Sequence, residues 1–75
     1  MPDVLRVLAQ RYGAVLENSR YNYGQQIYTF GFVTFSGVES FRKIVGECTR
    51  WINSVGASKL HKDSKRWVVD VEVHS

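Results

Sequence analysis

The stretch that decides the fold is Phe30-Gly31-Phe32-Val33-Thr34-Phe35, a predicted β-strand with apolar side chains on both faces. Alternation along a strand places three aromatic residues on one face, namely Tyr28, Phe30 and Phe32. It places on the opposite face Gly31, Val33 and Phe35. We assign the second set to the core beneath the following helix. The first set then forms an aromatic face that either stacks on bases or is covered by protein.

A helix start follows the strand at once. Ser36-Gly37-Val38-Glu39 has the spacing of a capping box, in which the Ser36 hydroxyl accepts from the Glu39 amide and the Glu39 carboxylate bonds back. The helix is predicted to run to Gly56, because apolar residues recur at steps of three and four. These residues are Val38, Phe41, Ile44, Val45, Cys48, Ile52 and Val55.

Toward the N-terminus, residues 2–12 carry apolar side chains at helical spacing, and Gly13 suits the position just after a helix. Residues 14–23 and 26–35 then read as two strands of a β-hairpin, joined at Tyr23-Gly24. With this turn, Tyr21 and Tyr23 fall on the same face as Phe30, so they join the aromatic face.

Toward the C-terminus, residues 59–74 alternate apolar and polar side chains and predict a second hairpin, with its turn near Lys62-Asp63-Ser64. The apolar half of this alternation is expected to face the helices, namely Trp67, Val69, Val71 and Val73. The predicted element order is α-β-β-α-β-β. The fold class is therefore α+β, with two helices packed on one face of a mostly antiparallel sheet of three or four strands.

Length and composition set further bounds. The 75 residues, 1–75, predict one small domain, and a formal charge of +3 permits nucleic-acid binding without requiring it. The single cysteine, Cys48, excludes an intramolecular disulfide and a cysteine-based metal site. The sequence has no apolar run long enough for a membrane span and no signal-peptide pattern, so we expect a cytoplasmic protein with no membrane association.

Residues 28–35 align with the octapeptide in the third strand of RNA recognition motifs and match its last six positions, and the chain resembles that family over about residues 3–50. Tyr28 and Thr29 stand at the positions of the family's basic residue and glycine, and the strand that precedes the first helix in that family is missing here. The resemblance implies that Phe30 and Phe32 are the exposed stacking residues.

The resulting hypothesis is a small binding module for RNA or single-stranded DNA, with bases stacked on the aromatic face. The densest basic cluster lies on the predicted C-terminal hairpin and would hold phosphates. The candidate binding residues are Tyr21, Tyr23, Tyr28, Phe30, Phe32, Lys59, Lys62, Lys65 and Arg66.

The alternative hypothesis is a protein-protein interaction module, either a homodimer or an inhibitor that docks on a larger protein complex. It would use the same aromatic sheet face or an open strand edge. We expect no enzymatic activity, because His61 and His74 are far apart in sequence and the acidic residues form no obvious catalytic pair. No catalytic residue, metal ligand or cofactor is predicted.

Overall fold

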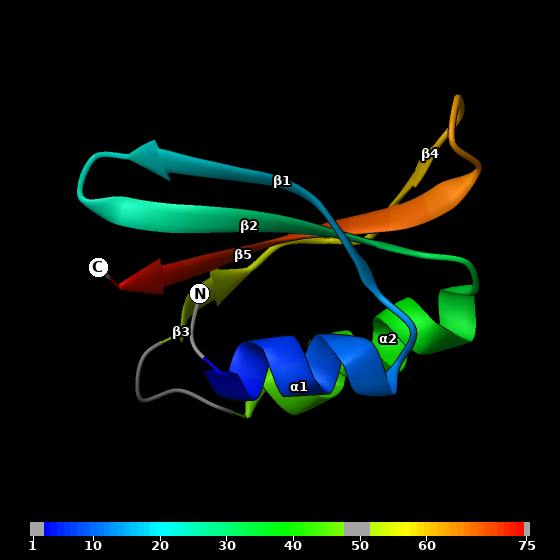
Figure 1. The fold of residues 1–75 in the computed structure, drawn as a ribbon, viewed down its shortest axis with the longest axis horizontal. Coiled ribbons are helices and arrows are strands. Elements are labelled where there is room, and N and C mark those ends of the chain that lie inside the picture. Colours follow the sequence, from blue (N-terminus) through cyan, green and yellow to red (C-terminus); the bar gives the residue numbers. More distant parts are fainter. Residues whose placement is uncertain (1–2, 48–51, 75) are drawn as a thin grey trace.

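The computed structural model describes residues 3–47 and 52–74, and in it two helices cover one face of a five-stranded antiparallel sheet (Figure 1). The elements in chain order are α1 (Asp3–Arg11), β1 (Val15–Asn22), β2 (Gln25–Phe32), α2 (Phe35–Gly46), β3 (Ile52–Val55), β4 (Lys59–His61) and β5 (Arg66–His74). The strands lie in the order β1-β2-β5-β3, and β4 also pairs with β5. The predicted α+β class is confirmed, and the sheet has one element more than the predicted order contained.

Helix α1 ends in the glycine cap that the sequence predicts. Gly13 has a φ of +74°, and its amide donates to the Gln10 carbonyl at 3.1 Å. The amide of Ala14 donates to the Ala9 carbonyl at 2.8 Å, which completes the pair of hydrogen bonds of a Schellman motif. This cap turns the chain from α1 into β1.

Strands β1 and β2 form the predicted hairpin around Tyr23-Gly24. Both turn residues have positive φ, +50° at Tyr23 and +80° at Gly24, as a two-residue type I′ turn requires. The register places Ser19 opposite Tyr28 and Tyr21 opposite Gln26. A bulge between Leu16 and Asn18 shifts this register by one residue.

Helix α2 begins two residues earlier than the capping box indicates. Its N-cap is Thr34, whose hydroxyl accepts a hydrogen bond from the Gly37 amide at 3.0 Å. Glu39 forms an ion pair with Arg42 at 2.7 Å instead of returning to a cap residue. The prediction of Ser36 as the N-cap is therefore wrong, because the neighbouring threonine supplies the same chemistry.

The segment from Ile52 to Val55 is strand β3, and the prediction of one helix as far as Gly56 is wrong. Ile52 lies opposite Val73 and Val55 opposite Val71, so the segment pairs with β5. The Gly56 amide then donates to the Asp70 carbonyl at 2.9 Å, and β4 pairs with the beginning of β5. Strands β3 and β4 thus line one edge of β5 in two pieces. The prediction for Cys48 lies outside the described residues.

The core lies between the helices and the sheet face that carries the aromatic residues of β2. Phe30 lies opposite Val69 and is 1% exposed, and Phe32 is 0% exposed. The ring of Phe41 from α2 packs against both, with centroids 5.3 Å from Phe30 and 5.1 Å from Phe32. The predicted burial of Val69, Val71 and Val73 on β5 is confirmed.

The assignment of Gly31, Val33 and Phe35 to the core is wrong. Val33 is 76% exposed and Phe35 is 50% exposed, while Gly31 belongs to the sheet face turned away from the helices. The physical reason is buried area, since burying the three aromatic side chains of Tyr28, Phe30 and Phe32 removes more apolar surface from water than burying one glycine, one valine and one phenylalanine.

Candidate nucleic-acid interface

The structure divides the predicted binding residues into three groups. Tyr28, Phe30 and Phe32 are buried beneath the helices. Tyr21 and Tyr23 are exposed at the β1–β2 turn. The basic residues belong to the β4–β5 hairpin, which lies at the opposite end of the sheet (Figure 1).

The buried rings cannot stack on bases in the folded chain. A stacking platform needs ring faces open to solvent, and Phe30 and Phe32 have almost no exposed surface. Of the two alternatives for the aromatic face, stacking on bases or cover by protein, the structure shows cover by the chain's own helices, and the stacking roles that the family resemblance implies for these two residues are therefore wrong. These side chains belong to the core, and a binding site must lie elsewhere on the molecule.

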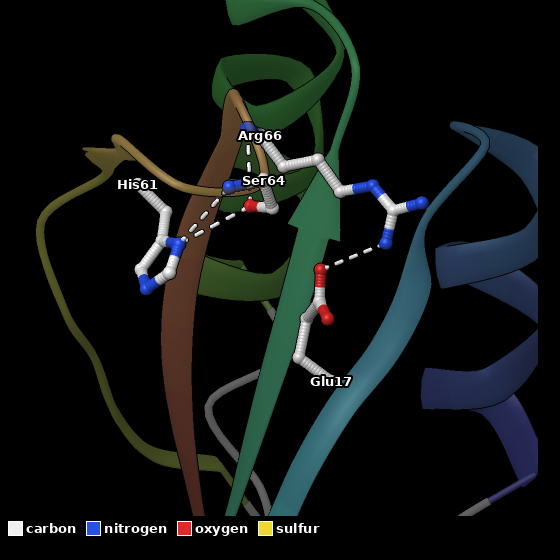
Figure 2. Close-up of polar contacts among 4 residues, drawn as sticks. All are labelled: Glu17, His61, Ser64 and Arg66. Atoms are coloured by element: carbon white, nitrogen blue, oxygen red, sulfur yellow. Dashed lines mark hydrogen bonds and ion pairs between the residues drawn. The ribbon is translucent and has the colours of Figure 1, made fainter.

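The β4–β5 turn is closed by local hydrogen bonds. The Lys65 amide donates to the His61 carbonyl at 2.8 Å, and Lys65 has a φ of +57°. The Ser64 amide donates to Nδ1 of the His61 ring at 3.4 Å, and the Ser64 hydroxyl lies 3.3 Å from the same atom (Figure 2). The imidazole of His61 thus holds the turn in one conformation. This conformation positions the backbone of Lys62 and Lys65.

Arg66 is held by an ion pair that crosses the sheet. Its guanidinium lies 3.1 Å from the Glu17 carboxylate, which reaches from β1 over β2 to β5 (Figure 2). Gly31 of β2 makes this possible, because a Cβ at that position would come within 3.0 Å of two carbon atoms of the Glu17 side chain. Arg66 is therefore engaged within the protein, unlike the lysines of the same hairpin.

Lys59, Lys62 and Lys65 carry the unpaired charge of this hairpin. All three are exposed, and within the described part of the chain none of them forms a salt bridge. The turn also contains one acid, Asp63, which is likewise exposed. Lys62 and Lys65 belong to the turn, whereas Lys59 lies in β4 opposite Val68, on the other sheet face from Leu60 and Trp67. Exposed ammonium groups on one hairpin can hold phosphate groups.

Apolar side chains lie at the same end of the molecule, where β2 leads into α2. Phe35 packs against Trp67 with ring centroids 4.8 Å apart at an interplanar angle of 65°. Leu60 lies opposite Trp67 across the β4–β5 pair and is more than half exposed. We call these three residues, together with Lys59, Lys62 and Lys65, the hairpin-end surface.

The sheet face opposite the helices is closed by polar contacts among its own side chains. The Thr29 hydroxyl donates to Asp70 at 2.5 Å, and Arg20 forms an ion pair with Asp70 at 3.2 Å. Asn53 donates to Gln25 at 2.8 Å and to Glu72 at 3.4 Å. Because these groups already satisfy one another, this face offers a ligand few free donors.

The contact between His61 and Ser64 does not make a nucleophile and base pair. It links residues three apart in one exposed turn, and among the described residues no carboxylate orients the imidazole. The described residues contain no group of three His, Cys, Asp or Glu side chains that could hold a metal ion. In the same part of the chain, neither helix is long and apolar enough to span a membrane.

Comparisons of the chain with protein-family models, with curated proteins and with solved structures find no match. The interpretation of the site therefore rests on its own chemistry.

The sequence identified the lysines of this surface but missed its apolar part. The alternation along the strand predicts a core position for Phe35, and no pattern in the sequence distinguishes Leu60. Trp67 was expected to lie on the helix-facing side of its strand, which its pairing with Phe32 confirms, and it is half-buried. The available signal was the position of Trp67 beside a hairpin tip, where the helices no longer cover the sheet.

Proposed function

We propose that this chain is a small, non-catalytic module that binds single-stranded nucleic acid at the hairpin-end surface. The observation that carries the proposal is the set of unpaired lysines, Lys59, Lys62 and Lys65, held on one hairpin whose turn is fixed by hydrogen bonds. Cations placed in this way replace condensed counterions along a phosphate backbone, which favours binding at low salt.

Phe35 supplies the stacking element of the proposal. Half of its surface is exposed while its ring is held against Trp67, so one part of the ring is fixed and another is open to solvent. A base can stack on such a ring irrespective of its identity, with a contribution of about 1–3 kcal/mol. The site thus combines the two elements that single-strand binders use, at a different place from the buried strand of the hexapeptide.

The alternative function is protein-protein interaction through an aromatic sheet face or an open strand edge. The aromatic face is not available for it, because Phe30 and Phe32 lie beneath the helices. We also propose a cytoplasmic location, which the single cysteine of the chain supports, since free thiols persist in reducing compartments.

The proposal is tested by titrating oligouridine into the protein at several salt concentrations. The triple variant Lys59→Gln, Lys62→Gln and Lys65→Asn removes the three charges, with asparagine at position 65 because it tolerates the positive φ there. We expect weaker binding and a log-log salt slope that is shallower by about 2, at about 0.7 per lost phosphate contact. Phe35→Leu should weaken binding about 5- to 100-fold with an unchanged slope, because it removes the ring but no charge.

The control is Lys43→Gln, since Lys43 on α2 is also exposed and also lacks a salt bridge among the described residues. It should leave both affinity and slope close to those of the unaltered protein. A slope change in the control of about one third of that in the triple variant, which removes three charges instead of one, would show that net charge alone attracts the oligonucleotide. That result, or binding that salt does not weaken, would contradict the proposal.

A further inference from the structure

Strand β1 is the long open edge of the sheet. All eight of its residues, Val15–Asn22, are exposed, and among residues 3–47 and 52–74 the only strand that pairs with it is β2, on one of its two sides. The other edge of the sheet is divided between β3 and β4, with Gly56 bonded to Asp70 between them. An edge strand whose outer amides and carbonyls have no strand partner is a template for another strand. Proteins usually protect such edges with lysine, proline, other charged side chains or a bulge. Strand β1 contains no lysine or proline, but it has a bulge after Leu16 and two charged residues, Glu17 and Arg20, so a pairing strand must match these features.

The bulge after Leu16 decides which β1 side chains share a face. Leu16 lies opposite Phe30, and Tyr21 lies opposite Gln26, so both are on the side of the helices. Arg20 reaches Asp70 and Glu17 reaches Arg66, so both are on the side away from the helices. Without the bulge, Leu16 and Tyr21 would point to opposite faces, because their sequence separation is odd.

We propose that two copies of this chain pair antiparallel through β1, about a two-fold axis at Ser19. Leu16 then faces Tyr21 of the second copy, and Asn18 faces Arg20 of the second copy. The bulged Glu17 of each copy lies next to Arg20 of the other copy. The interface therefore contains two contacts between opposite charges. The pairing covers two large apolar side chains on each copy, Leu16 at 45% and Tyr21 at 65% exposure.

Neighbouring registers lack this complementarity. An axis at Arg20 sets the two arginines directly opposite each other, which is unfavourable for like charges. An axis at Asn18 sets Leu16 against Ser19 and Val15 against Arg20, so apolar residues face polar ones. A slip by a single residue turns each side chain toward the wrong face of the joint sheet. The sequence of β1 is thus self-complementary in one register.

The inference does not depend on nucleic-acid binding, because β1 contributes no residue to the hairpin-end surface. It is tested with two charge-reversal variants, Glu17→Arg and Arg20→Glu, by sedimentation from about 1 μM to about 1 mM protein. The unaltered chain should show a monomer-dimer equilibrium. Each variant alone should be at least tenfold weaker in self-association, because position 17 of one copy then repels position 20 of the other.

An equimolar mixture of the two variants provides the decisive observation. In the mixed dimer each contact joins an arginine to a glutamate, so association should return although neither variant has regained its own internal ion pair. Circular dichroism of each variant checks that it is folded. Tyr21→Lys tests the apolar contact with Leu16 of the second copy and leaves the ion pairs intact. It should weaken dimerisation at least tenfold.

The matched control is Lys43→Glu on α2, which makes the same change of charge as Arg20→Glu away from β1 and should leave the dimer unchanged. The inference is overturned if the unaltered chain is a monomer at every concentration. It is equally overturned if the mixture of the two variants associates no better than each variant alone.

Discussion

At the scale of single residues, the ring of Phe41 joins the sheet to α2. It packs with its centroid within 5.3 Å of Phe30 and 5.1 Å of Phe32, and all three rings are almost fully buried. Aromatic pairs at such distances add about 0.5–1.5 kcal/mol each beyond the burial of their surface. A domain of this size depends on these contacts, because a short chain buries a smaller share of its surface on folding than a larger domain does.

This packing predicts different outcomes for two phenylalanines of the same stretch. Phe32→Ala should lower the free energy of unfolding by about 3–5 kcal/mol, as expected for a large residue removed from a closed core. Phe35→Ala should lower it by about 1–2 kcal/mol, because Phe35 is half exposed and the variant loses only the contact with Trp67 and the buried half of the side chain. Urea unfolding of both variants measures the difference. Equal losses would show that the two rings are equally buried.

The sequence could not decide between the two faces of this strand. Both carry apolar side chains, so alternation alone gives two consistent assignments. What decided the outcome is the pairing of Phe30 with Val69 and the shape of the space beneath α2, which depend on residues far away along the chain. The ion pair of Glu17 with Arg66 could not be predicted for the same reason. It joins β1 to β5 across the strand between them, where Gly31 leaves room for the Glu17 side chain.

At the scale of elements, short-range signals were the most informative. The cap at Gly13 and the turn at Tyr23-Gly24 depend on backbone conformations that few residues adopt, so neighbouring residues were sufficient to predict them. The end of α2 was different. Ile52 and Val55 continue the helical spacing by coincidence, yet they form strand β3 because β5 offers them a partner.

The hairpin turn gives a prediction at this scale. Tyr23 has a φ of +50°, a conformation that asparagine adopts at lower cost, and its side chain is fully exposed. Tyr23→Asn should therefore raise the free energy of unfolding by about 0.5–1 kcal/mol. Gly24→Ala should lower it by about 1–2 kcal/mol, because Gly24 has a φ of +80°. Thermal unfolding measures both, and a destabilising Tyr23→Asn would mean that the tyrosine makes a contact that outweighs its strain.

At the scale of the whole molecule, the two ends of the sheet differ in character. The β1–β2 turn ends in exposed tyrosines, whereas the β4–β5 turn carries unpaired lysines beside Phe35 and Trp67. The sequence located the lysine hairpin correctly, because charges on a turn need no tertiary partner to be recognised. It could not bring Phe35 next to Trp67, since these residues meet only when β5 pairs with β2.

The most direct test of the proposed interface is a nuclear magnetic resonance titration of the isotope-labelled protein with oligouridine. We predict that the largest amide shift changes fall on residues 59–66 and on Phe35 and Trp67. The amides of Tyr21 and Tyr23 should change little, because they lie at the other end of the sheet. Changes centred on those tyrosines, or the absence of any change at the lysine hairpin, would contradict the proposed interface.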